Sequence, residues 1–230
     1  AWTIRARDLE PGNPDHNHRL AELFAVIGDF DTALELEPEP GVGLLYRMRR
    51  YEELVDTAEF LMIEEPHDVV LRYLLAFGHN AIGDFDAALR ILESTGQPDT
   101  VLLEPRASTD LEGFITLMNA AFGAGEMEVA RGLANFWVTK PHPVNQDWWQ
   151  DVNWACAKMI EGNRIEALDR FSQVRRSARL PVRPILLDSP CLKNLSGEPV
   201  YEEILELVEA KRSALRGRLP ATLAEFEVEL

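Results

Sequence analysis

The sequence predicts an all-α fold, a solenoid built from a row of antiparallel helix pairs. Residues that favour helices dominate the chain, and no alternating run of Val, Ile and Thr reaches the length of a strand. A short phrase in which Ala follows Gly by five residues recurs along the sequence. Hydrophobic residues make up 46% of the 230 positions, so the chain can bury a large core.

The recurring phrase has a direct physical meaning as a turn between two helices. Its clearest copies span residues 28–34 and 83–89, and weaker copies begin at Gly125 and Gly162. Glycine ends one helix in a left-handed conformation, the next residue favours the following helix N-terminus, and the small Ala lets two helices approach closely. Each copy therefore predicts a helix–turn–helix unit.

This spacing resembles the tetratricopeptide repeat (TPR), a helix pair of about 34 residues whose turn contains Gly, an aromatic residue and Ala. With Gly28 and Gly83 at the turn, repeats begin at Pro14 and Val69 with the aromatic residue and Ala in register. The resemblance covers about residues 1–179. It implies a right-handed α-solenoid that binds other polypeptides.

The remaining units are irregular. Repeats are expected to begin near residues 35, 111 and 148, in addition to those near 14 and 69. The second helix of the first full repeat is expected to be short, because the prolines within residues 37–41 deny the backbone its helical hydrogen bonds. Proline-marked loops are expected over residues 96–105 and 140–143.

Residues 1–13 read as the end of an incomplete repeat. The chain starts there without a methionine. This favours the interpretation that the sequence is the C-terminal piece of a larger TPR protein.

After residue 179 the repeat pattern fades. Residues 180–198 predict an irregular connector, because prolines interrupt the helical spacing. Apolar residues then recur on one face from Pro199 to Leu215, and residues 199–230 are expected to form a capping helix and tail.

The phrase before this helix runs from Asp188 and Pro190 to Glu198 and Tyr201. It resembles the closing segment of TPR regions attached to bacterial nucleotide cyclases and winged-helix transcriptional regulators. In those regions Asp and Phe stand where this chain has Glu198 and Tyr201.

Charge limits the partners. The formal net charge is −16, from 39 acidic and 23 basic residues, and such a field repels phosphate backbones. Nucleic acid is therefore not expected as a partner of this segment, and a protein or peptide is. No apolar run approaches the length of a membrane span, so membrane insertion is not expected either.

The two cysteines, Cys156 and Cys191, show no spacing typical of a metal site and do not make a disulfide framework. We expect Cys156 to be a small buried thiol. Two cysteines fit the cytoplasm, and an exported domain of a membrane-bound sensor remains open. No metal, cofactor or catalytic constellation is predicted.

In the TPR family the first helix of each repeat lines a concave groove. Transfer of that register proposes six partner-binding residues: Tyr73, Phe77, Asn119, Phe122, Trp149 and Asn153. Rings supply buried area and amides can bond a peptide backbone. Aromatic residues at helical spacing are also typical of a core, and this second interpretation stays open.

A groove of the kind that clamps carboxylates is not expected. Such grooves use Lys and Arg, where this chain has Val70 and Leu74.

Three functions remain. The first is a protein–protein interaction scaffold that binds a peptide or protein segment in the groove. The second is the regulatory or sensory region of a larger signalling protein whose effector domain lies upstream. The third is a helical enzyme with a site that the sequence does not reveal. A homodimer formed through exposed faces is compatible with each of them.

Overall fold

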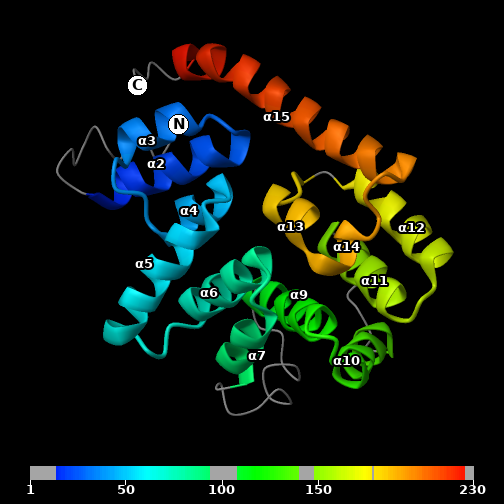
Figure 1. Cartoon of the computed structure of the whole chain (residues 1–230). Coiled ribbons are helices and arrows are strands. Elements are labelled where there is room, and N and C mark those ends of the chain that lie inside the picture. Colours follow the sequence, from blue (N-terminus) through cyan, green and yellow to red (C-terminus); the bar gives the residue numbers. More distant parts are fainter. Residues whose placement is uncertain (1–13, 94–107, 140–147, 178, 226–230) are drawn as a thin grey trace.

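The computed structural model describes residues 14–93, 108–139, 148–177 and 179–225 (Figure 1). Every regular element in these ranges is helical and no strand occurs among them, which confirms the predicted all-α class. The expected incomplete repeat at residues 1–13 lies outside the described residues, as do the expected loops at 96–105 and 140–143.

The helices up to residue 172 are divided into two alternating sets, called the first and the second row. Each helix of the first row contacts the next one in that row. The first row comprises α2 (Pro14–Ile27), α4 (Val42–Met48), α6 (Val69–Ile82), α9 (Ser108–Gly123) and α11 (Trp148–Ile160). Each of these helices also contacts the second-row helix that follows it in sequence. The second row comprises α3 (Phe30–Leu36), α5 (Tyr51–Glu64), α7 (Phe85–Glu93), α10 (Met127–Thr139) and α12 (Arg164–Ser172).

The turns between paired helices have the predicted chemistry. Gly28, Gly83, Gly125 and Gly162 all have φ between 79° and 89°. After three of them an acidic or amide side chain caps the next helix: Asp29 accepts from the Thr32 N–H, Asp84 from Ala87 and Asn163 from Glu166. The turn between α4 and α5 has no glycine, and Arg49 takes the left-handed conformation there with φ 62°.

The corner after α3 lies where the prolines predict it. α3 is seven residues long and ends at Leu36, and α4 begins at Val42. Within the corner, the Glu37 side chain accepts a hydrogen bond of 2.8 Å from the Gly41 N–H. Helices begin at Pro14, Val69 and Trp148, where repeats are expected to start, whereas the units expected near 35 and 111 begin at Val42 and Ser108.

The stretch 180–198 is not the irregular connector that the sequence predicts. It contains two short helices, α13 (Arg183–Asp188) and α14 (Pro190–Lys193). Pro184 and Pro190 lie in the first turns of these helices, where the missing N–H would have no intrahelical partner. Prolines that read as helix breakers therefore begin helices here.

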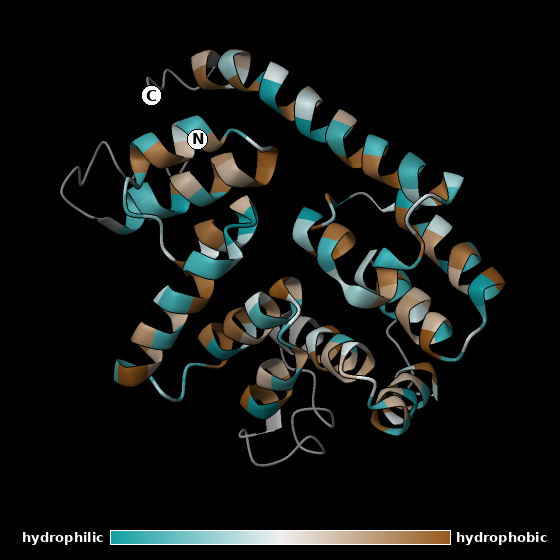
Figure 2. Cartoon of the chain, in the orientation of Figure 1, coloured by the Kyte–Doolittle hydropathy of each residue, from teal (hydrophilic) through white to brown (hydrophobic). Residues whose placement is uncertain are grey.

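The last helix, α15 (Pro199–Glu225), begins at the predicted residue but extends beyond Leu215. It packs against α12 and also returns to α2, so it joins the two ends of the described array (Figure 1). Much of its length is hydrophilic (Figure 2). Arg212 and Arg216 donate hydrogen bonds to the carbonyl groups of Ala25, Val26 and Ile27 at the end of α2.

The largest cluster of buried side chains joins α9, α10, α11 and α12 to α13, α14 and the first turns of α15. Met118, Phe171, Leu186 and Leu192 are fully buried in it. Because α13 and α14 are part of this core, the segment they form is an integral part of the fold.

Candidate functional site

The six residues proposed for the groove are not exposed. Phe122 is half-buried and the other five are buried, with exposed fractions of 7% for Tyr73, 6% for Phe77, 2% for Asn119, 8% for Trp149 and 0% for Asn153. They therefore do not form an open groove in this structure. Their role in binding a partner stays a prediction.

A segment of the same chain covers part of the surface on which these residues lie. Residues 183–193, which comprise α13 and α14 and are called the inner segment below, lie against the first-row helices (Figure 1). α13 contacts α4, and α14 contacts both α9 and α11. We call the surface of α4, α6, α9 and α11 that faces this segment the inner face.

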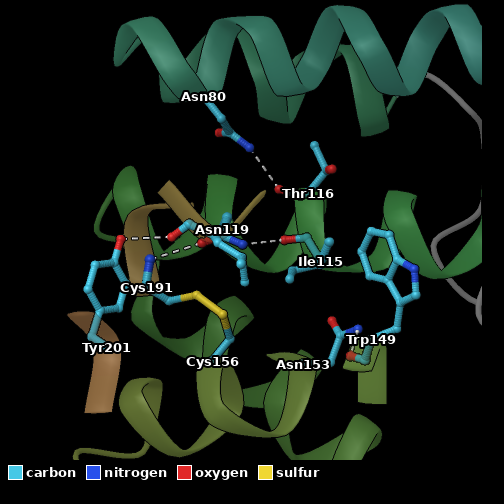
Figure 3. Close-up of a disulfide and its surroundings, with 10 residues drawn as sticks. Asn80, Ile115, Thr116, Asn119, Trp149, Asn153, Cys156, Cys191 and Tyr201 are labelled. Carbon is cyan, nitrogen blue, oxygen red and sulfur yellow. Dashed lines mark hydrogen bonds between the residues drawn. A yellow bond between two sulfur atoms is a disulfide. The ribbon is translucent and has the colours of Figure 1, made fainter. Parts of the chain in front are cut away.

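Asn119 links the inner face to the backbone of the inner segment (Figure 3). Its Oδ1 accepts a hydrogen bond of 2.9 Å from the backbone N–H of Cys191, and its Nδ2 donates to the Ile115 carbonyl at 2.7 Å. Both bonds are buried. A side-chain amide that bonds a peptide backbone is the interaction predicted for Asn119, although the peptide belongs to the same chain.

A disulfide holds the same point covalently. Cys156 on α11 is bonded to Cys191 on α14, and both residues are fully buried (Figure 3). The expectation of a free buried thiol at Cys156 is therefore wrong. The two cysteines lie 35 positions apart, and helix spacing alone does not show that α14 folds back onto α11.

The end of α13 is anchored by the Asp188 carboxylate, which is 5% exposed. Arg49 donates two hydrogen bonds to it, from Nε at 2.7 Å and from Nη2 at 2.8 Å. The Tyr51 hydroxyl donates a third at 2.5 Å. The hydrogen bond to Asp188 raises the pKa of Arg49, and burial followed by the hydrogen bond to Asp188 raises the pKa of Tyr51.

Sequence reasoning missed this carboxylate site. Its only local signal was Arg49 at the position where the other turns have glycine.

Tyr201 fastens the start of α15 to the inner segment. Its hydroxyl donates a hydrogen bond of 2.9 Å to the Leu186 carbonyl, and its ring stacks on Phe171 with centroids 5.7 Å apart. Burial, assisted by the charges of Glu202 and Asp188, raises the pKa of Tyr201 to about 12.

One part of the inner face remains open. A small pocket lies between the inner segment and α6, and its empty volume of about 330 Å³ includes open solvent. Tyr73 and Phe77, two of the six proposed residues, line it together with Val70 and Ile185. Val70 is 48% exposed, so this part of the inner face is accessible from solvent.

Two buried amides flank Asn119 on the neighbouring helices. Asn80 on α6 donates to the Thr116 carbonyl at 2.9 Å, and Asn153 on α11 donates to the Trp149 carbonyl at the same distance (Figure 3). The Oδ1 atoms of Asn80 and Asn153 have no hydrogen-bond partner among the described residues.

The described residues contain neither a metal-binding cluster nor a membrane-spanning helix. No group of three or more His, Cys, Asp or Glu side chains there could hold a metal ion. None of the helices in that part of the chain is both long enough and apolar enough to cross a bilayer.

Comparison with known proteins adds no relative. No protein-family model matches this chain, and no curated protein or solved structure matches it.

Proposed function

We propose that this protein is an interaction scaffold, an irregular α-solenoid of TPR-like helix pairs that binds a polypeptide segment along its inner face. The observation that supports this most strongly is the buried bond from the Cys191 N–H to the Asn119 side chain. Recognition of a backbone group by a fixed side-chain amide does not depend on the sequence of the bound segment.

The inner segment serves as a template for what the inner face accepts. Its backbone meets Asn119, its acidic side chain meets Arg49 and Tyr51, and Leu186 and Leu192 are fully buried. A second polypeptide held by the same physics would combine apolar side chains with backbone groups aimed at amides.

The place for that second polypeptide is the open pocket beside the inner segment. Its lining is mostly apolar, and the Asn80 side chain, which has an unpaired buried acceptor, lies on the same helix, α6. We propose that a short apolar segment of a partner protein lies along α6 at Val70, next to residues already bound by the chain itself. Tyr73 and Phe77 then act as the floor of the site.

The test uses two valines with the same exposure. Val70, in the pocket, is 48% exposed, and Val129, on α10, is 49% exposed. A photo-crosslinking amino acid is placed at position 70 or at position 129 in cells, and the crosslinked peptides are sequenced. Binding of the recovered partner is then measured for Val70→Asp and Val129→Asp.

The proposal predicts crosslinks from position 70 to one recurring apolar segment, and loss of binding in Val70→Asp alone. Both valines are exposed, so neither change disturbs the core. Equal recovery from both positions, or partner binding that survives Val70→Asp, would place the interaction elsewhere.

A second candidate is the regulatory region of a larger signalling protein. It is favoured by the phrase that resembles the closing segment of cyclase and regulator TPR regions. In this chain Asp188 and Tyr201, two residues of that phrase, hold the inner segment in place. The test is the output of an effector domain in the full-length gene product: Tyr201→Phe changes that output if the phrase regulates it, and leaves it unchanged if the phrase only completes the fold.

The disulfide is evidence about the cellular compartment of the protein. Disulfides persist in oxidising compartments and are rare in the cytosol. We therefore propose the exported alternative over the cytoplasm. Rapid alkylation of denatured protein taken directly from cells checks this: both cysteines should resist alkylation, and two labelled thiols would favour the cytoplasm.

A further inference from the structure

A second pocket lies where the two ends of the described array meet. It is formed by α2, α4, α13, α15 and the chain just before α13, and its empty volume is about 600 Å³ including its opening to solvent. Three arginines line it, Arg47 from α4, Arg183 from α13 and Arg212 from α15. The other lining residues are apolar: Ala25, Val26, Leu180, Pro181, Val182 and Pro184.

The charge of this pocket is opposite to that of the chain. No carboxylate is found among its lining residues, although acidic residues outnumber basic ones by 39 to 23 in the whole sequence. No hydrogen bond or ion pair holds Arg47 or Arg183 within the described ranges, and the Nε of Arg47 is buried without a partner. Arg47 and Arg183 thus line the same pocket without a direct ion pair among the described residues, although the charge of Glu209, outside the lining, acts on Arg183.

Arg212 adds a third charge that is only partly compensated. It is 4% exposed, and its Nε and Nη2 donate to the Val26 and Ala25 carbonyls. Burial lowers the pKa of Arg212; the charge of Glu209 opposes this, while Arg183 and Arg216 add to it. Glu209, 3.6 Å from Arg212, is also bonded to Arg216 and interacts with the charge of Arg183, so one carboxylate is shared by three guanidinium groups.

We propose that this pocket binds a small organic anion that carries at least two negatively charged oxygens as phosphate or carboxylate groups. Guanidinium forks match both groups with paired hydrogen bonds, and buried charges in proteins are normally paired. Arg47 and Arg183 supply the free donors, and the apolar wall contacts the carbon part of the ligand.

The location gives binding a structural consequence. The ligand touches α2 and α4 from the N-terminal half of the chain and α13 and α15 from the C-terminal half. It therefore stabilises the closed arrangement of these helices, because any ligand that binds only the folded state raises the melting temperature.

The experiment titrates the intact protein with pyrophosphate and, separately, with citrate, by calorimetry at constant ionic strength. Matched variants are Arg47→Gln and Arg183→Gln in the pocket and Arg131→Gln as the control. Arg131 is exposed on α10 and does not line the pocket. Arg183→Lys keeps the charge and removes the fork.

We expect saturable binding of at least one anion and a rise in melting temperature. Loss of either pocket guanidinium should weaken binding by about tenfold or more, and Arg183→Lys should recover part of it, whereas Arg131→Gln should bind like the parent. Binding of pyrophosphate alone identifies a phosphate ligand, and binding of citrate alone identifies a carboxylate ligand. Absence of saturable binding by both anions, or equal binding by all the variants, would overturn the proposal.

Discussion

Reduction of the Cys156–Cys191 disulfide should loosen the inner segment and lower the stability of the whole protein. The bond joins α11 to α14 within the largest core cluster. The contacts of Asn119 and Asp188 remain after reduction, so the reduced chain should still fold. Its unfolded state, however, gains conformational entropy, because the disulfide no longer closes a loop in the chain.

The size of this effect follows from the length of the loop. For a sequence separation of 35, the chain-entropy relation gives about 4 kcal/mol at 25 °C. In a protein of this size each kcal/mol moves the melting temperature by about 2–4 °C. Reduction should therefore lower it by about 8–16 °C.

The assay compares thermal unfolding of the same protein with and without a reductant. The double variant Cys156→Ala with Cys191→Ala is the control, because Ala fits both fully buried positions without adding a polar group. Its melting temperature should lie near that of the reduced protein and should not respond to the reductant.

Two results would refute this reasoning. One is native protein whose cysteines both react with an alkylating reagent in denaturant before any reduction, since the bond would then be absent. The other is reduced protein, verified by mass spectrometry, that melts within about 2 °C of the oxidised form. In that case the cross-link would not restrict the unfolded chain as the entropy relation requires.

Three further predictions concern single residues. Gly28→Ala should lower the free energy of unfolding, measured in urea, by more than Gly83→Ala does. Both glycines have positive φ, which costs about 1–2 kcal/mol for Ala. Only at Gly28 would the added Cβ also lie 2.6 Å from an α15 arginine. Equal losses of unfolding free energy in the two variants would mean that the α15 arginine moves away from the added methyl group without cost. Tyr51→Phe should lower the free energy of unfolding by about 1.5–3 kcal/mol, because it removes a hydrogen bond to the buried Asp188 carboxylate. An unchanged urea midpoint would argue against that bond. Burial raises the pKa of Asp151 against the opposing charges of two nearby arginines, so the folded state favours the protonated acid and loses stability as pH rises through the raised pKa. Asp151→Asn should therefore raise the urea midpoint at pH 7 and give no gain near about pH 3, where the carboxyl is protonated in both states; a gain of the same size at both values would contradict the shift.

Local chemistry explains what the sequence could predict. A positive φ at Gly28 and Gly83 is a property of a few neighbouring residues, and so is the helix start at Pro199. The Gly–acid turn and the apolar spacing on one face need no knowledge of distant chain. These signals locate most helices within a few residues.

The interactions that sequence reasoning missed all join distant positions. Arg49 meets Asp188 across 139 positions, and Arg212 meets α2 across more than 180. Neither the spacing of apolar residues nor the capping residues of a helix reveal contacts between such distant positions. The same limit explains the disulfide, because it depends on where α14 folds back onto α11.

Asn119 marks the boundary between the two kinds of inference. Its position on the first helix of a pair predicts a bond to the backbone of a partner, whereas the structure has a bond to the backbone of Cys191 in the same chain. The sequence does not reveal which peptide Asn119 bonds, because residues 180–198 are predicted to be an irregular connector and nothing indicates where it packs. The prolines that suggested irregular chain lie at the starts of α13 and α14.

Hydrogen exchange of the inner segment tests the central claim most directly. In the oxidised protein, peptides that cover residues 183–193 should exchange as slowly as those from α9 and α11, because the Cys191 N–H is bonded to Asn119 in a buried site. After reduction the segment should exchange faster while α9 and α11 stay protected. Exchange of the segment at the rate of free chain in the oxidised protein, with α9 and α11 protected, would contradict its place on the inner face.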